Sequence, residues 1–265
     1  KEEHWLFIMK EKKKRNSFLF LAVVAAITFL AITITEYNVV KGFTSLPDAV
    51  GWALSNFYPT QESLTKLPGI WEKMLETLLV SIAATSIAAV FALLFAILGS
   101  NTTKVNAFFG AISRGIATIF RNIDVAAWAM ILLFSFGQST LTGYFALFFG
   151  SFGFLTRAFV ETIDEVSGNS VEALKATGAG YFSIIFQSVI PSSIPQIISW
   201  ILFMIETNIR NATLIGLLTG SGIGFTFNLY YKSLSYDVAS LVVIVIIVVI
   251  LGIETISNYV RRVVL

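Results

Sequence analysis

Long apolar runs, each separated from the next by a shorter polar segment, dominate the pattern of this chain. The runs cover about residues 18–35, 74–98, 105–136, 142–160, 195–218 and 238–256. A helix of about 20 apolar residues spans the hydrocarbon core of a bilayer, and each run is near that length or longer. The third run is long enough to begin as a cytoplasmic or interfacial helix before it crosses. The pattern therefore predicts an all-α, polytopic membrane protein with about six transmembrane helices.

Basic residues predict how these spans are oriented. A cluster of Lys and Arg at residues 10–15 stands directly before the first run, and Arg261 and Arg262 close the chain. Lys104 and Arg114 follow the second run. Because basic residues that flank a span stay on the cytoplasmic side, we expect both termini to be cytoplasmic.

The same pattern divides the chain into three parts. Residues 1–17 are expected to form a cytoplasmic N-terminal segment, residues 18–73 the first transmembrane helix and an outer loop, and residues 74–265 a helical core. Within the outer loop, the segment Leu46–Phe57 predicts a short interfacial helix, since Trp and Tyr settle at membrane surfaces. The first run lacks a convincing small-residue cleavage site, so we expect it to remain as a span.

Composition narrows the classes of function. The chain is 56% hydrophobic and only 13% charged, whereas soluble domains carry about 25% charged residues. It contains no cysteine and a single histidine, His4, which leaves no thiolate chemistry and no histidine cluster for a metal or a catalytic base. The phosphate-loop pattern G-x-x-x-x-G-K-[ST] is absent. We therefore expect a non-catalytic subunit with no cofactor, no metal and no nucleic-acid partner.

The candidate residues for a transport path lie in the fifth run, in the stretch FMIETNIRNATLIG, which contains Glu206, Asn208 and Arg210. An ionisable residue at membrane depth costs at least about 2.5 kcal/mol unless it pairs or faces water. Glu206 and Arg210 are four residues apart on a helix, so they can pair. Two interpretations stay open: a self-neutralising buried pair, or a translocation path or gate where Arg210 attracts an anion. Arg121 is a weaker candidate, since an arginine that snorkels to the interface explains it equally well.

Three glycines follow the fifth run, Gly220, Gly222 and Gly224 in G-S-G-I-G. Their spacing does not fit a dinucleotide-binding turn, and they follow a membrane span rather than a soluble strand. Clustered glycines permit irregular backbone where protein surrounds it, so we predict a hinged or re-entrant loop.

The polar segment Glu172–Pro195 lies between the fourth and fifth runs. Asn169 or Ser170 is expected to cap a short helix with Glu172 in its first turn, and Gly178 is expected to end that helix. Residues at helical spacing then predict one apolar stripe, made of Phe182, Ile185, Phe186 and Val189. On these grounds alone, an ordinary amphipathic loop helix at a membrane surface explains the segment equally well.

The order of these residues resembles the EAA loop of permease subunits in binding-protein-dependent ABC importers. That family's pattern is E-A-A, three residues, G, about nine residues, then I-x-L-P. The chain has Glu172-Ala173, Gly178-Ala179 and Val189-Ile190-Pro191, followed by Pro195; Leu174 stands at the third position of the pattern. The matching positions, together with the phenylalanines of the apolar stripe, make the expected ATPase-coupling residues Glu172, Ala173, Gly178, Ala179, Phe182, Phe186 and Pro191.

The resemblance implies a type I ABC importer permease fold over residues 74–265, with the coupling loop at about 165–195. It also implies partners: a dimer of ABC ATP-binding subunits that hydrolyse ATP, an extracytoplasmic substrate-binding protein, and a second permease copy in a homodimer. The expected location is the plasma membrane of a prokaryote, where the lipid bilayer surrounds the spans. A secondary transporter, the alternative from another class, would show repeated halves with matching broken helices, and the sequence shows no such repeat.

Three further stretches are similar to phosphonate-type permeases. Glu206 to Thr213 fits E-x-N-x-R-x-A-T, and the glycine stretch is similar to G-A-G-G-I-G. Arg121 to Phe134 is similar to R-x-I-P followed by an apolar run, but Asp124 stands at the proline position, which leaves a bend there open. The resemblance implies transport of a phosphonate or a related phosphorus oxyanion. Import of methionine or another small solute is the alternative, since the EAA motif is shared.

Overall fold

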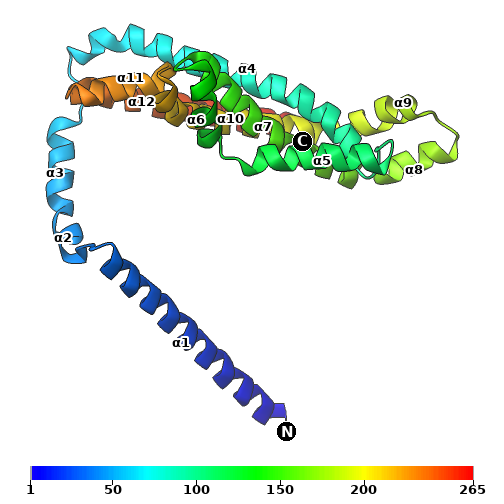
Figure 1. The fold of residues 1–265 in the computed structure, drawn as a ribbon, viewed down its shortest axis with the longest axis horizontal. Helices are drawn as coiled ribbons and strands as arrows, with labels where there is room; N and C mark the ends of the chain where they lie inside the picture. Colours follow the sequence, from blue (N-terminus) through cyan, green and yellow to red (C-terminus); the bar gives the residue numbers. More distant parts are fainter. Residues whose placement is uncertain (1, 265) are drawn as a thin grey trace. The chain divides into compact units, whose positions relative to one another are not determined.

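The computed structural model describes the backbone of residues 2–264 and the side chains of residues 12–263. His4 and the first basic residue of the N-terminal cluster, Lys10, lie outside the described side chains. Within the described range every regular element is a helix (Figure 1), which confirms the all-α prediction. The chain forms two compact units, one up to Asn56 and one from Phe57 onward.

The first unit holds three helices. Helix α1 (Glu2–Ile34) carries the first apolar run, and α2 (Val39–Thr44) follows after a short turn. Asn38 caps α2, because its Oδ1 accepts a hydrogen bond from the Lys41 N–H at 2.9 Å. Helix α3 (Leu46–Asn56) coincides with the predicted short helix, and its side chains are exposed within this unit.

The second unit contains the remaining helices. They are the 3₁₀ turn η1 (Ser63–Lys66), α4 (Leu67–Gly99), α5 (Ala107–Asn122), α6 (Val125–Phe136), α7 (Thr140–Val166), α8 (Gly168–Ala176), α9 (Tyr181–Ile184), the π turn η2 (Ile185–Val189), α10 (Ile190–Thr219), α11 (Gly222–Lys232) and α12 (Tyr236–Val264). Helix α7 packs against α4, α5, α6 and α10, so it is the central helix of this unit.

Small residues on α4 and α7 allow this close packing. Ala84, Ala88, Ala92 and Ala96 recur every four residues on α4 and are fully buried. On α7, a Cβ built at Gly150 would lie 2.6 Å from the Val125 side chain, so only glycine fits that approach. Small residues thus let α7 approach its neighbours closely.

The count of spans agrees with the prediction. Five described helices are long and apolar enough to cross a membrane, and the bent pair α5–α6 makes a sixth if it is one span. The predicted start of the second span at residue 74 was late, because α4 begins at Leu67. Pro68 is compatible with the first turn, where no N–H bond is lost. The fifth span was also predicted too short: α10 begins at Ile190, and Pro195 lies inside the helix rather than ahead of it.

The third run breaks without a proline. Helices α5 and α6 meet at an angle of 90°. Asp124 has an extended backbone there, and its Oδ1 accepts a hydrogen bond from the Ala126 N–H at 2.8 Å. An aspartate at this position therefore starts a new helix by capping it, which produces the break that the sequence had left open.

Candidate functional site

The segment that connects α7 to α10 begins as a near-continuation of α7. Ser167 is the N-cap of α8, but its hydroxyl donates to the Ile163 carbonyl at 2.6 Å and does not cap the new helix. The predicted caps Asn169 and Ser170 were wrong, because both lie within the first turn of α8. Glu172 accordingly lies one turn later than predicted.

The end of α8 agrees with the prediction. Gly178 has a φ of +80°. Its N–H donates to the Lys175 carbonyl at 3.0 Å, and the Ala179 N–H donates to the Leu174 carbonyl at 3.1 Å. These two bonds form a Schellman motif, in which glycine takes the left-handed position at no steric cost.

The four apolar residues beyond this turn do not form the single stripe that their spacing predicted. Ile185 and Val189 are 5% and 1% exposed and pack in the core, whereas Phe182 and Phe186 are 73% and 66% exposed. On a helix with about 100° per residue, the two pairs are roughly 60° apart. The core therefore covers one pair and leaves the two phenylalanines uncovered.

Most of the other predicted coupling residues are exposed as well. Glu172, Ala173, Gly178 and Pro191 are exposed, and Ala179 is half-buried. Sequence reasoning missed the residue that supports this end of the molecule. Asp164, near the end of α7, accepts hydrogen bonds from the Ser100 hydroxyl at 2.5 Å and from the Thr102 N–H at 3.1 Å. The loop after α4 is thereby tied to the end of α7, just before α8.

The predicted path residues separate into two groups. The Glu206 carboxylate lies 2.9 Å from Arg210 and 3.4 Å from Arg261 of α12, and its side chain is 12% exposed. The Arg210 side chain is 44% exposed, so the pair is only partly buried. Glu206 thus links α10 to α12, while the Arg210 guanidinium reaches open space.

Asn208 lies in the interior, away from that pair. It is 0% exposed, and its amide donates to the hydroxyls of Thr85 at 2.8 Å and Ser151 at 2.5 Å. The Ser81 hydroxyl lies 3.4 Å from the Asn208 carbonyl. Asn208 therefore joins α4, α7 and α10 and faces no open space in this chain.

The predicted glycine loop is a tight turn between α10 and α11. Gly220 and Gly222 have φ values of +67° and +63°. Gly224 has another role, since a Cβ at this position would lie 1.8 Å from the Thr213 carbonyl oxygen of α10. Gly224 is therefore a close-packing position between α11 and α10. The hinge role of the three glycines stays a prediction.

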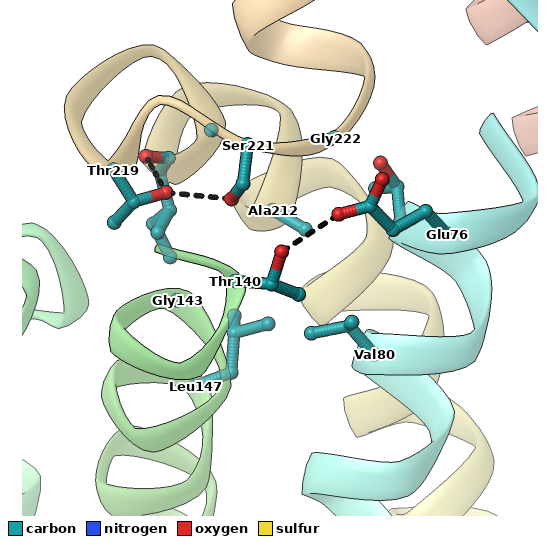
Figure 2. A pocket seen from close by; sticks show the side chains of 12 residues that line it. Glu76, Val80, Thr140, Gly143, Leu147, Ala212, Thr219, Ser221 and Gly222 are labelled. Atoms are coloured by element: carbon teal, nitrogen blue, oxygen red, sulfur yellow. Dashed lines mark hydrogen bonds between the residues drawn. The ribbon is translucent and has the colours of Figure 1, made fainter. Parts of the chain in front are cut away.

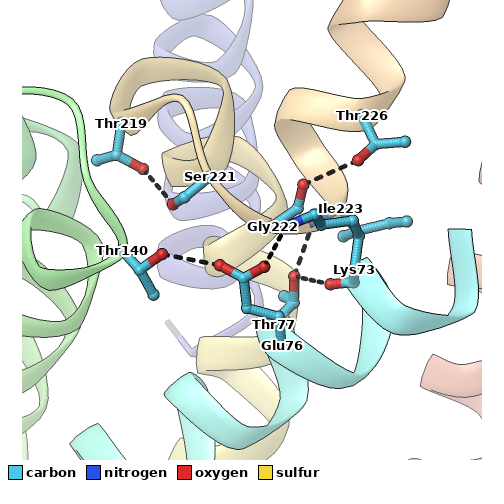
Figure 3. Close-up of polar contacts among 9 residues, drawn as sticks. All are labelled: Lys73, Glu76, Thr77, Thr140, Thr219, Ser221, Gly222, Ile223 and Thr226. Atoms are coloured by element: carbon cyan, nitrogen blue, oxygen red, sulfur yellow. Dashed lines mark hydrogen bonds and ion pairs between the residues drawn. The ribbon is translucent and has the colours of Figure 1, made fainter. Parts of the chain in front are cut away.

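A polar cluster holds this turn in place, and Figure 3 shows its contacts. The Thr77 hydroxyl accepts the Ile223 N–H at 2.9 Å. The Glu76 carboxylate accepts the Thr140 hydroxyl at 2.8 Å, pairs with Lys73 at 2.8 Å and accepts the Gly222 N–H. Side chains of α4 and α7 thereby fix the start of α11.

A cavity of about 20 Å³ lies beside this cluster (Figure 2), bounded by Glu76, Thr140 and Ser221 among others. That volume suits about one water molecule. Sequence reasoning missed Glu76, although an acidic residue at the start of a long apolar run was the available signal.

Arg121 lies at the end of α5 and faces α7, rather than joining the residues of α10 and α12. No hydrogen bond or ion pair is made by its guanidinium within the described part of the chain. In the same part, no group of three or more His, Cys, Asp or Glu side chains is placed to hold a metal ion.

Comparison with known proteins now decides the family. Residues 88–264 match the family described as "Binding-protein-dependent transport system inner membrane component". The chain belongs to this family. It is therefore a multi-pass membrane permease component, as predicted.

Relatives of this permease include two bacterial proteins. It is 30% identical over 190 residues to the phosphate-import permease protein PhnE of Mycolicibacterium smegmatis, covering 72% of this chain and 36% of that protein. It is 27% identical over 189 residues to the phosphite transport system permease protein PtxC of Stutzerimonas stutzeri, covering 71% and 69% of the two chains. The permease thus spans little more than a third of the first of these relatives.

The fold of the permease is similar to that of a chain of the MetNI methionine ABC transporter in inward-facing conformations. The TM-score is 0.65 at 17% identity, covering 78% of this permease and 99% of that chain. The likeness confirms the type I ABC importer permease fold.

Proposed function

We propose that two copies of this permease form the translocation path of an ATP-driven importer for a phosphonate or a related phosphorus oxyanion. Both relatives described above are named as permeases for phosphorus oxyanions, phosphate in one case and phosphite in the other. The stretch that contains Arg210 and the glycine turn support the same class of cargo through their resemblance to phosphonate-type permeases. An extracytoplasmic binding protein delivers the substrate and determines most of the substrate specificity.

One observation carries the coupling to an ATPase. Phe182 and Phe186 are exposed on one side of a segment whose other side, Ile185 and Val189, is buried in the core. An apolar pair of this kind fits a groove on a partner, and burial of each phenylalanine contributes about 1.5–3 kcal/mol. Since the opposite face is packed into the core, movement of the partner is transmitted to α10. The sequence has no phosphate loop, so the partner is the subunit that binds and hydrolyses ATP.

Arg210 is the path residue in this proposal. Its guanidinium pairs with Glu206 while the Arg210 side chain is 44% exposed, so it offers positive potential to an anion from a defined position. Asn208 is buried in the interior and Arg121 lies beside α7, so neither is a path residue in this proposal. Asn208 acts here as the interior link that keeps α10 in register with α4 and α7, which supports the position of Arg210.

Reconstitution tests both parts of the proposal. The permease is placed in liposomes with an ATP-binding subunit and a binding protein, and uptake of methylphosphonate, phosphite, phosphate and methionine is measured with ATP hydrolysis. We expect uptake of at least one phosphorus oxyanion. The double variant Phe182→Ala/Phe186→Ala is expected to lower uptake at least about tenfold, because two docking side chains are removed. Arg210→Ala is expected to lower uptake while leaving the assembled complex intact.

The matched control is Phe29→Ala, since Phe29 of α1 is 73% exposed, like Phe182, and lies outside the coupling loop. Uptake restricted to methionine would refute the phosphorus oxyanion assignment. Normal coupling of ATP hydrolysis to uptake in the double phenylalanine variant would refute docking at this surface. Normal uptake in Arg210→Ala would mean that the Glu206–Arg210 pair has only a structural role.

A further inference from the structure

Two helix faces, one on α5 and one on α7, pack against each other near the coupling loop. On α5 the face is made of Arg114, Ala117, Thr118 and Arg121, and on α7 it is made of Gly153, Thr156, Arg157 and Val160. Both sets follow the spacing i, i+3, i+4, i+7, which places their members on one side of a helix. Three of these eight positions are arginines, so the contact carries an unusual concentration of positive charge.

Gly153 sets the distance between the two faces. A Cβ at this position would lie 2.4 Å from the Arg121 backbone nitrogen, so the helix backbones touch there. Ala117, Thr156 and Val160 are buried in the contact. Arg121 and Arg157 lie on its exposed rim. This close approach brings the backbones of α5 and α7 together at the positions that carry the rim arginines.

A cleft of about 40 Å³ opens between these faces, and we refer to it as the arginine cleft. All three arginines line it, and among the described residues that line it none is acidic. The Arg114 guanidinium is anchored by a 2.6 Å hydrogen bond to the Gly99 carbonyl. Arg157 pairs with Glu161 of the next turn of α7. The Arg121 guanidinium has no partner in the described chain, so one carboxylate faces three guanidinium groups.

This excess of charge lies toward the end of α7 that leads into the coupling loop. Arg157 precedes the end of α7 by about nine residues, which is a rise of roughly 13 Å along the helix axis. A guanidinium in a partly enclosed cleft is costly without a partner, and like charges on neighbouring helices repel. An anion in the cleft relieves both costs at once.

We propose that the arginine cleft binds a phosphate-type oxyanion. The planar fork of a guanidinium matches the oxygens of such a group in a bidentate manner. The Asn122 amide, which gives one N–H to the Thr118 carbonyl, has a second N–H to offer beside the guanidinium groups. A free phosphonate or phosphate ion and the headgroup of an anionic phospholipid share this chemistry. The assignment of a free ion rests on the proposed function, whereas the assignment of an oxyanion site does not.

Equilibrium binding to the full-length permease, purified in a maltoside detergent without phosphate groups, tests the proposal. Radiolabelled inorganic phosphate and methylphosphonate are titrated in one arm, and short-chain phosphatidylglycerol in the other. Arg121→Gln and Arg157→Gln are each expected to weaken binding at least about tenfold, since a charge-assisted hydrogen bond is lost. Arg121→Lys keeps the charge without the planar fork, so its affinity is expected to lie between those of the wild type and Arg121→Gln. Arg262→Gln is the control, because it removes one exposed arginine from a different helix.

Each outcome is decisive. If the arginine variants weaken the binding of phosphate or methylphosphonate, the cleft is a site for a free oxyanion. If they weaken the binding of phosphatidylglycerol alone, the cleft is a lipid site. Either supports an oxyanion site. The oxyanion site is overturned if neither arm shows binding. It is also overturned if the wild type and Arg121→Gln bind with equal affinity while both proteins elute as folded species. Cleft-dependent phosphate binding in a permease that fails to import phosphorus oxyanions would refute the proposed function and leave the site standing.

Discussion

Of the turns in which a glycine at positive φ ends a helix, those after α8 and α10 have different surroundings. At the first, after α8, nothing lies within 4 Å of a Cβ built at Gly178. At the second, after α10, a Cβ at Gly222 would lie 2.5 Å from the Thr77 hydroxyl, and Gly220 approaches Gln138. The backbone geometry is alike, but one turn stands free and the other is clamped.

The difference shows what each turn is suited to do. The first is held by its Schellman bonds, by the Thr177 hydroxyl and by the packing of Leu174 and Ala179 on the core, and its outer surface is exposed. The second is fixed by Glu76 and Thr77 of α4 and by Thr140 of α7, which bind the start of α11 and each other. In the proposed importer the first turn is the one that contacts the ATPase, and the second is a rigid junction.

The largest expected effect concerns the packing of the clamped turn. Gly224→Ala places a methyl group 1.8 Å from the Thr213 carbonyl oxygen, so one helix must move. We expect a loss of roughly 3 kcal/mol or more of stability, as for severe overpacking of a core. Gly180→Ala is the control, since nothing lies within 4 Å of its Cβ. Thermal unfolding in detergent, followed by size-exclusion fluorescence, measures both. Equal melting temperatures would contradict the close approach of α11 to α10.

The next effect concerns the hydrogen bonds of the clamp. Glu76→Ala leaves the Gly222 N–H and the Thr140 hydroxyl without their acceptor and removes the partner of Lys73. We expect a loss of about 2–3 kcal/mol, because two donors lose a charged acceptor. Glu72→Ala on the same helix is the matched control, since Glu72 is exposed. The same unfolding assay decides: if both variants melt together, Glu76 does not clamp the turn.

The free turn was predictable from sequence to a greater extent than the clamped one. Gly178 follows a short polar helix, and glycine as a helix terminator is a local signal. The cap was missed because Ser167 bonds back to α7, which makes α8 almost a continuation of that helix. The division of the four apolar residues into a buried and an exposed pair was also beyond the sequence, because only the packed core decides which side of a stripe is covered.

The clamp was not predictable because its members come from distant parts of the chain. Glu76 and Thr140 are 64 residues apart, and Thr77 and Ile223 are 146 apart. Likewise, Asn208 belongs to one motif with Glu206 and Arg210, yet the structure directs it to the opposite side of α10. The break at Asp124 was also left open, because an aspartate that caps a helix replaces a proline by different chemistry with the same result.

The smallest expected effect returns to the free turn. Gly178→Ala adds no clash, so its only cost is a left-handed backbone for a residue with a Cβ, about 1–2 kcal/mol. This strain is confined to an exposed turn, so we expect the melting temperature to change little, while transport coupled to ATP hydrolysis falls roughly five- to tenfold. Gly180→Ala, with a φ of −71°, lacks the strain and serves as the control. A large fall in melting temperature would mean that the turn after α8 supports the whole fold, and unchanged coupling would mean that its geometry does not reach the ATPase.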